Sequence, residues 1–236
     1  MGEVLFPRVV PVVTKPFYVK PSFADNDWET IVKACQKGRV PETWKVGDQK
    51  IMTIGGTDYP IDIIGKNHDV YADGSGTAPL TFQLHNIYKT KYAMDTDTYN
   101  GDGWNGCNMR RTYLPKVLAA MPSEVQAGIR EVSKWTSEGN DSSTIEKTSD
   151  TLFLLSEIEI FGKITKSFAG EGSQYAYYVG VEEAIKTHVG STEAQYWFER
   201  SPHNGSLKWY CCVDIWGGPA TQGAEDVHGA APAFCF

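Results

Sequence analysis

The stretch QKIMTIGGTDYPIDIIGK, residues 49–66, predicts the first sheet element of this chain. Two short runs with β-branched and aromatic residues, 49–54 and 59–66, flank the turn-forming residues Gly55 to Asp58. Such runs on either side of a glycine turn are typical of an antiparallel hairpin. We therefore expect two paired strands here.

A helix is expected on the N-terminal side of this hairpin, over residues 26–37. Its apolar residues Trp28, Ile31, Val32 and Cys35 recur at the spacing of one helix face. Asn26 is a candidate N-cap, and Gly38 is a candidate stop signal. The same periodicity places Cys35 in the core.

The rest of the chain predicts further short elements without a regular strand–helix alternation. We expect a strand at 80–87, a helix at 107–120 that Pro115 kinks or restarts, and a polar loop at 136–149 between strands at 129–135 and 151–155. A helical turn at 156–161, short helical pieces within 174–188, and strands at 196–200, 207–216 and 232–236 follow. Short strands mixed with short helices indicate an α+β fold. The apolar C-terminus is expected to be tied into the sheet.

Residues 1–24 predict a separate extended segment. Prolines 7, 11, 16 and 21 interrupt it, and proline disfavours both helix interiors and central strands. The segment is nevertheless apolar, through Leu5, Phe6, Val9, Val10, Val12, Val13 and Phe17. An extended apolar arm needs a surface to cover, either on its own domain or on a neighbouring subunit. We expect it to be an assembly arm of a homo-oligomer, for example a trimer, preceding a domain at 25–236.

Composition excludes several classes of partner. The formal net charge of -7, with no run of basic residues, argues against nucleic-acid binding, which needs clustered Lys and Arg. No apolar stretch is long enough to insert into a membrane, and the first 20 residues do not resemble a signal peptide. The five cysteines lack the spacing of a zinc site or a disulfide framework, so neither a metal nor a cofactor is expected.

Several motifs occur in an order that resembles an uncharacterised domain family common in phage and gut-bacterial proteins. They are WKVGD (44–48), IIGKNHD (63–69), WNGCNMRRTYL (104–114), LFLLSEIEIFG (152–162), EGSQYAYY (171–178), YWFERSP (196–202) and HGAAPAFCF (228–236). Members of that family show a W-W-L-R-S-P-like strand and a closing G-V-R-P-A-F strand. Ala230 and Ala231 stand here where the closing strand of the family often has Val-Arg.

That family is similar in turn to the C-type lectin-like fold of phage tropism determinants and formylglycine-generating enzymes. The resemblance implies a C-type lectin-like α+β domain, with ligand-contacting positions near its C-terminal end. It implies a structural protein of a phage virion, such as a receptor-binding, head-fibre or decoration component. Such a protein would contact other virion proteins through its arm and a glycan or protein on the host surface through its domain. A bacterial surface adhesin is an alternative.

Candidate catalytic and metal-binding residues do not form an established pattern. Asp95, Asp97, Asn100 and Asp102 offer oxygen ligands, but Tyr99 interrupts the spacing of a calcium loop, which favours a solvated turn. Cys211 and Cys212 are adjacent on an expected strand, unlike the separated cysteines of formylglycine-generating enzymes. We therefore expect no catalytic residues. An enzyme of that type, or a glycan hydrolase, stays as the alternative.

The remaining candidates lie in the loops beside the last strands, 201–206 and 217–229. Aromatic and polar side chains on such loops can contact a ligand, because a rigid scaffold holds the loops in place. The candidate ligand-binding residues are His203, Asn204, Trp209, Trp216 and His228. A core position for Trp209 and Trp216 is the alternative.

Overall fold

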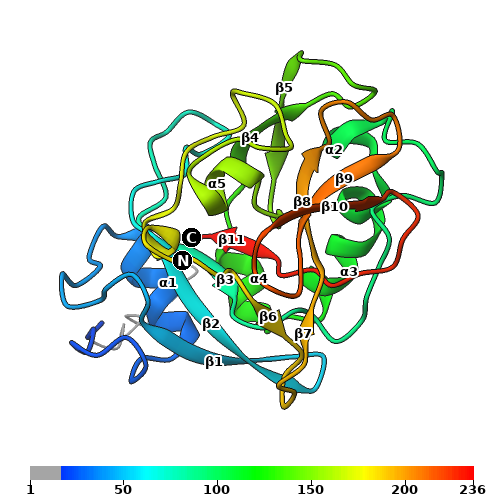
Figure 1. Ribbon diagram of the computed structural model, residues 1–236. Helices are drawn as coiled ribbons and strands as arrows, with labels where there is room; N and C mark the ends of the chain where they lie inside the picture. The colour runs from blue at the N-terminus through cyan, green and yellow to red at the C-terminus, as the bar shows by residue number, and fades with distance from the viewer. Residues whose placement is uncertain (1–16) are drawn as a thin grey trace, which may run out of the picture.

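The computed structural model describes residues 17–236 and contains a central four-stranded antiparallel sheet (Figure 1). The predicted hairpin forms β1 (Gln49–Ile54) and β2 (Thr57–Gly65), which pair in register from Gln49 opposite Asp62 to Ile54 opposite Thr57. Next to them lie β3 (Thr81–Leu84) and β11 (Ala233–Cys235). The C-terminal strand is thus tied into the sheet by pairing with β3 at its edge, as expected from its apolar residues.

Helix α1 (Trp28–Gln36) confirms the predicted helix, with a different N-cap. Asp27 accepts a hydrogen bond from the backbone N–H of Thr30 at 2.7 Å and caps the helix. The expected cap, Asn26, instead bonds to backbone groups of residues 20 and 22. Gly38 follows the helix with a φ of 61°, a left-handed conformation that glycine adopts without strain.

A second sheet is formed by β8 (Trp197–Pro202), β9 (Trp209–Val213) and β10 (Pro219–Gly223), in the order β10-β9-β8 (Figure 1). Strands β8 and β9 confirm the predicted strands near the end of the chain. Strand β10 lies where the sequence predicts a loop. Its segment begins with proline and ends with glycine, and both residues are uncommon inside strands, so an edge strand of this composition carries little sequence signal.

Two small hairpins complete the strands: β4 (Val132–Ser137) with β5 (Ile145–Asp150), and β6 (Lys186–Thr187) with β7 (Ala194–Gln195). The predicted polar loop at 136–149 is wrong, because β5 lies within it. The buried residues of β5 are the polar Thr148 and Asp150, so the apolar alternation that marks a strand is missing. The predicted strand at 151–155 is also wrong, since it makes one isolated bridge, from Phe153 to Ala233.

The predicted helix at 107–120 is divided between two helical types. Residues Met109–Tyr113 form the π-helix η1, which continues directly into α3 (Leu114–Ala119) with Pro115 in its first turn. The other helical elements are α2 (Gly103–Gly106), α4 (Ser123–Gly128), α5 (Glu157–Phe161) and the 3-10 turn η2 (Ala176–Tyr178). The chain therefore has the predicted α+β fold.

The core is rich in aromatic rings and extends back to residue 23. Phe82 lies at its centre, with ring centroids 6.0 Å from Phe23, 5.9 Å from Trp28, 5.3 Å from Phe234 and 5.1 Å from Phe236. All five rings are buried. Phe23 belongs to the arm predicted at 1–24, so the packed domain begins earlier than residue 25.

Of the predicted assembly residues, the structure describes Phe17 alone. Its half-buried ring packs against the core of its own domain, with the cationic groups of Lys37 and Arg39 at 5.3 and 5.6 Å from the ring centroid. Leu5, Phe6, Val9, Val10, Val12 and Val13 lie outside the described residues. Within residues 17–236, none of the helices has the length and apolar character needed to cross a membrane.

The aromatic core gives a direct test of this packing. We expect Phe82→Ala to lower the free energy of unfolding by about 3–5 kcal/mol, because it leaves a cavity between four other rings. The control is Ile51→Ala, at a side chain that is 51 % exposed, which should change stability much less. Urea unfolding followed by tryptophan fluorescence measures both variants. Equal losses in the two variants would contradict the assignment of Phe82 to the core.

Candidate ligand-binding surface

Three of the predicted ligand-binding residues lie together where β8 ends and β9 begins. His203 follows β8, and its backbone N–H donates to the carbonyl of Trp209 at 2.9 Å. The two side-chain rings meet edge to face, with centroids 5.8 Å apart. The N–H of Asn204 donates to the carbonyl of Lys166 at 2.7 Å, which ties the loop to the segment after α5.

Large hydrophobic side chains are exposed around this loop. Trp209 is 48 % exposed, Leu207 is 46 % exposed and Tyr99 is 50 % exposed. Tyr99 was not among the predicted ligand residues; it adjoins the loop because the N–H of Asn100 donates to the carbonyl of Leu207 at 2.8 Å. We call Tyr99, His203, Asn204, Leu207 and Trp209 the hairpin surface. Burying exposed aromatic side chains against a partner is a common source of binding energy.

The buried side chain of Asn100 holds the loop of the hairpin surface in place. Its amide nitrogen donates to the carbonyls of Ser206 and Trp209 at 2.9 and 2.8 Å, and its oxygen accepts from the N–H of Asn140 at 2.9 Å. A Cβ at Gly139 would lie 2.0 Å from the carbonyl oxygen of Asn100, so only glycine fits there. The loop is therefore fixed by the side chain of Asn100, which the N–H of Asn140 in turn holds in place.

These bonds also bear on the calcium alternative. Asn100 uses its side chain to hold the loop, and Asp95 accepts from the amide of Asn108 at 2.9 Å and from the N–H of Thr96 at 2.7 Å. Asp97 and Asp102 are exposed. Within residues 17–236, no three His, Cys, Asp or Glu side chains are grouped so that they could hold a metal ion.

Trp216 and His228 lie away from the hairpin surface. Trp216 is 69 % exposed in the turn between β9 and β10, at the opposite end of that hairpin from Trp209. His228 forms a bridge with Tyr92, and its ring centroid is 5.4 Å from the rings of Tyr196 and Phe198, near the start of β8. The exposure of both tryptophans contradicts the alternative that they belong to the core.

His203 gives the surface a polar group of defined charge. Burial lowers its pKa, and the nearby ammonium group of Lys166 adds to the effect, so the ring is neutral near pH 7. A neutral imidazole can donate one hydrogen bond and accept another. Nδ1 of His203 is buried without a hydrogen-bond partner in the described residues, so Nε2 is the nitrogen that is left for a ligand. Beside an exposed tryptophan, this group suits a ligand that carries both an apolar face and hydroxyl groups.

Comparison with known proteins assigns most of the chain to a family. Residues 81–236, more than half of the chain, match the model of a family described as a domain of unknown function, DUF6273. The chain belongs to this family. No curated protein and no solved structure matches the chain. The match confirms the coarser part of the resemblance, an uncharacterised domain family, and it includes every residue of the hairpin surface.

A buried ion network supports β8 in the DUF6273 domain. Arg200 on β8 donates to both carboxylate oxygens of Glu159 on α5, at 3.0 Å for the Nη2–Oε1 pair. Lys134 on β4 donates to Glu159 at 2.9 Å and to Asp69 at 2.6 Å. Tyr175 accepts from Lys134 and donates to Asp69, both at 2.9 Å. The network thus joins β4, α5 and β8.

Opposite charges and hydrogen bonds stabilise the ionised forms of these buried carboxylates. Burial acts to raise the pKa of Asp69, but the ammonium group of Lys134 and hydrogen bonds outweigh it and lower the pKa. The pKa of Glu159 is likewise lowered, because Arg200 and Lys134 offset its burial. The partners of Glu159, Lys134 and Arg200, are distant along the chain, so no local sequence pattern identifies them.

Glu199, beside Arg200, has the opposite environment. Its side chain is fully buried, and neither carboxylate oxygen has a hydrogen-bond partner within residues 17–236. Burial and the nearby carboxylates of Glu157 and Glu171 raise the pKa of Glu199 well above its ordinary value. Burial also raises the pKa of Glu171, to about 7. The folded domain therefore favours the protonated form of Glu199.

A protonated Glu199 predicts a pH dependence of stability. The folded-state pKa of Glu199 lies above the unfolded value of 4.5. Its contribution to the free energy of unfolding is therefore complete below pH 4.5 and is lost as the pH rises above this value. Glu199→Gln removes this loss, so we expect the melting temperature of the variant to exceed that of the wild type by about 3 °C or more at pH 8. The difference should shrink towards pH 5. Melting curves across this range measure it, with Glu42→Gln at an exposed position as control; a difference that does not change with pH would contradict the buried neutral acid.

Proposed function

We propose that this protein is a non-enzymatic attachment component of a phage virion, which binds a glycan or protein on the host surface through the hairpin surface. The observation that carries the proposal is the exposure of Tyr99, Leu207 and Trp209 around a loop that buried Asn100 holds rigidly. Rigid aromatic side chains supply contact area at little entropic cost. The virion location rests on the motif resemblance, and a bacterial surface adhesin would use the same residues.

The C-type lectin-like character of the domain is part of this proposal. The α+β fold has short antiparallel strands, and the hairpin surface lies beside its last strands, where related folds contact their ligands. The polar loop residues His203 and Asn204 adjoin the exposed Trp209. A sugar presents the complementary combination, with hydroxyl groups at its edge and an apolar face.

The chemistry of the buried residues favours a binding protein over the enzymatic alternatives. All five thiols are buried, and burial raises the pKa of Cys35 and Cys107 to about 12 and raises the pKa of Cys211 and Cys212. A reactive cysteine needs partly exposed, electropositive surroundings that lower the pKa of its thiol. Glu157 accepts hydrogen bonds from the N–H groups of Lys166 and Ser167 at 3.0 and 2.8 Å, so its carboxylate is already occupied.

Binding to a glycan array that includes bacterial surface polysaccharides tests the ligand-binding role. We expect the wild type to bind a restricted set of glycans and Trp209→Ala to weaken that binding about tenfold or more, because it removes the central aromatic contact. Trp135→Ala is the matched control, since Trp135 is 38 % exposed on β4 and lies outside the hairpin surface. Equal binding by the two variants, or no binding by the wild type, would count against a glycan-binding hairpin surface.

The proposed assembly through the N-terminal arm has its own test. The full chain should form a homo-oligomer, and deletion of residues 1–16 should convert it to a monomer, because apolar side chains of the arm would lose their site on a neighbouring subunit. Size-exclusion chromatography with light scattering measures both masses. The deletion keeps Phe17, which packs on its own domain. A full chain that is monomeric would remove the argument for arm-mediated assembly.

A further inference from the structure

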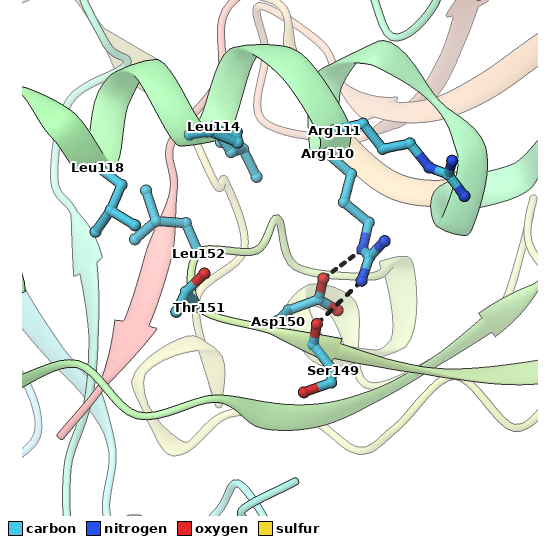
Figure 2. Close-up of a pocket in the computed structure, with 9 residues that line it drawn as sticks. Arg110, Arg111, Leu114, Leu118, Ser149, Asp150, Thr151 and Leu152 are labelled. Atoms are coloured by element: carbon cyan, nitrogen blue, oxygen red, sulfur yellow. Dashed lines mark hydrogen bonds and ion pairs between the residues drawn. The ribbon is translucent and has the colours of Figure 1, made fainter.

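A cavity of about 230 Å³ opens between two segments that lie outside the hairpin surface (Figure 2). One wall is the continuous helix formed by η1 and α3, and the other is the chain at 149–152, where β5 ends. None of the predicted ligand-binding residues lines it. Its volume is below the range of about 300–1,000 Å³ that is usual for drug-sized ligands, so it suits a small molecule.

The cavity is apolar at one end and charged at the other. Leu114 and Leu118 point down from α3 towards Leu152, and they form the apolar end (Figure 2). Arg110 points towards Asp150 at the other end, whereas Arg111, which also lines the cavity, points away from Asp150 and from the leucines (Figure 2). This division fits an amphipathic ligand with one charged group.

The helix turn that carries the two arginines has an unusual backbone. The N–H of Leu114 donates to the carbonyl of Met109, five residues back, which defines a π-helical turn. π-helical turns are rare in proteins, and many of those that occur lie at functional sites. Arg110 Nη1 and Arg111 Nε both donate to the carbonyl oxygen of Asn105, at 3.1 and 2.8 Å, so the two consecutive arginines converge on one carbonyl.

The two guanidinium groups differ in how many of their N–H groups already have an acceptor. Arg110 is paired with Asp150 at 2.5 Å and also donates to the carbonyl of Ser149 at 3.0 Å. Arg111 is exposed, and within residues 17–236 its Nη1 and Nη2 atoms have no hydrogen-bond acceptor. These donors suit a carboxylate, which a guanidinium group can bind with two parallel hydrogen bonds.

Neighbouring acidic residues do not occupy this position. Glu146 accepts from the side-chain amide of Asn105 at 3.1 Å, and Glu131 accepts from the hydroxyl of Ser149 at 2.5 Å. Neither glutamate lines the cavity. We propose that the cavity binds a small carboxylate with a short apolar chain, its carboxylate on Arg111 and its chain between Leu114, Leu118 and Leu152.

NMR titration of the full chain with hexanoate at pH 7 tests the site. We expect saturable shifts at residues 110–118 and 149–152, with acetate and 1-hexanol each binding at least about tenfold more weakly, since each lacks one half of the ligand. Arg111→Gln should raise the Kd for hexanoate about tenfold, because it removes the charge-assisted hydrogen bonds. Lys45→Gln, at an exposed cation outside the cavity, should leave the Kd unchanged.

A second variant tests the apolar end. Leu118→Ser, at a half-buried position, should weaken hexanoate more than acetate, and a melting curve verifies that the variant is folded. Absence of saturable binding of hexanoate, shifts outside the cavity, equal affinity for 1-hexanol, or an unchanged Kd in Arg111→Gln would each overturn the proposed carboxylate site.

Discussion

The buried ion network around Glu159 is the interaction on which the rest of the domain depends. One carboxylate accepts from Arg200 on β8 and from Lys134 on β4, and Asp69 and Tyr175 complete the bonding of Lys134. These segments belong to two different sheets and a short helix. Removal of one partner from such a network leaves an uncompensated buried charge, at a cost of about 3–5 kcal/mol. The network therefore sets how β4, α5 and β8 pack.

The position of β8 in turn determines where the hairpin surface lies. Arg200 is three residues before His203, so the end of β8 and the start of the loop are close to the fixed guanidinium group. Asn100 then holds the loop, and the hydroxyl of Tyr210 donates to the carbonyl of Gly103 at 3.0 Å. This last bond links β9 to α2, which precedes the helix that lines the cavity at Arg110 and Arg111. Hydrogen bonds thus connect the secondary-structure elements that carry the two proposed binding sites.

Local patterns predicted those elements whose burial follows a regular period. The hairpin at 49–66 and α1 have clear apolar spacing, and the apolar residues of β11 placed the C-terminus in the sheet correctly. Strands β5 and β10 escaped prediction because their residues are polar, half-buried or glycine and proline. The site was predicted in part: His203, Asn204 and Trp209 come together because the chain itself keeps them close, whereas Tyr99 and Asn100 reach the loop from about 100 residues away. The Glu159–Arg200 pair, 41 residues apart, has no local signature.

Hydrogen–deuterium exchange of Glu159→Gln tests most directly whether the network positions β8 and the loop after it. If it does, the folded variant will lose protection in β4, α5, β8 and the segment 203–209, while β1 and β2 keep the protection of the wild type. A variant with unchanged protection in β8 and its loop, or with an equal loss over β1 and β2, would contradict the central role of the network.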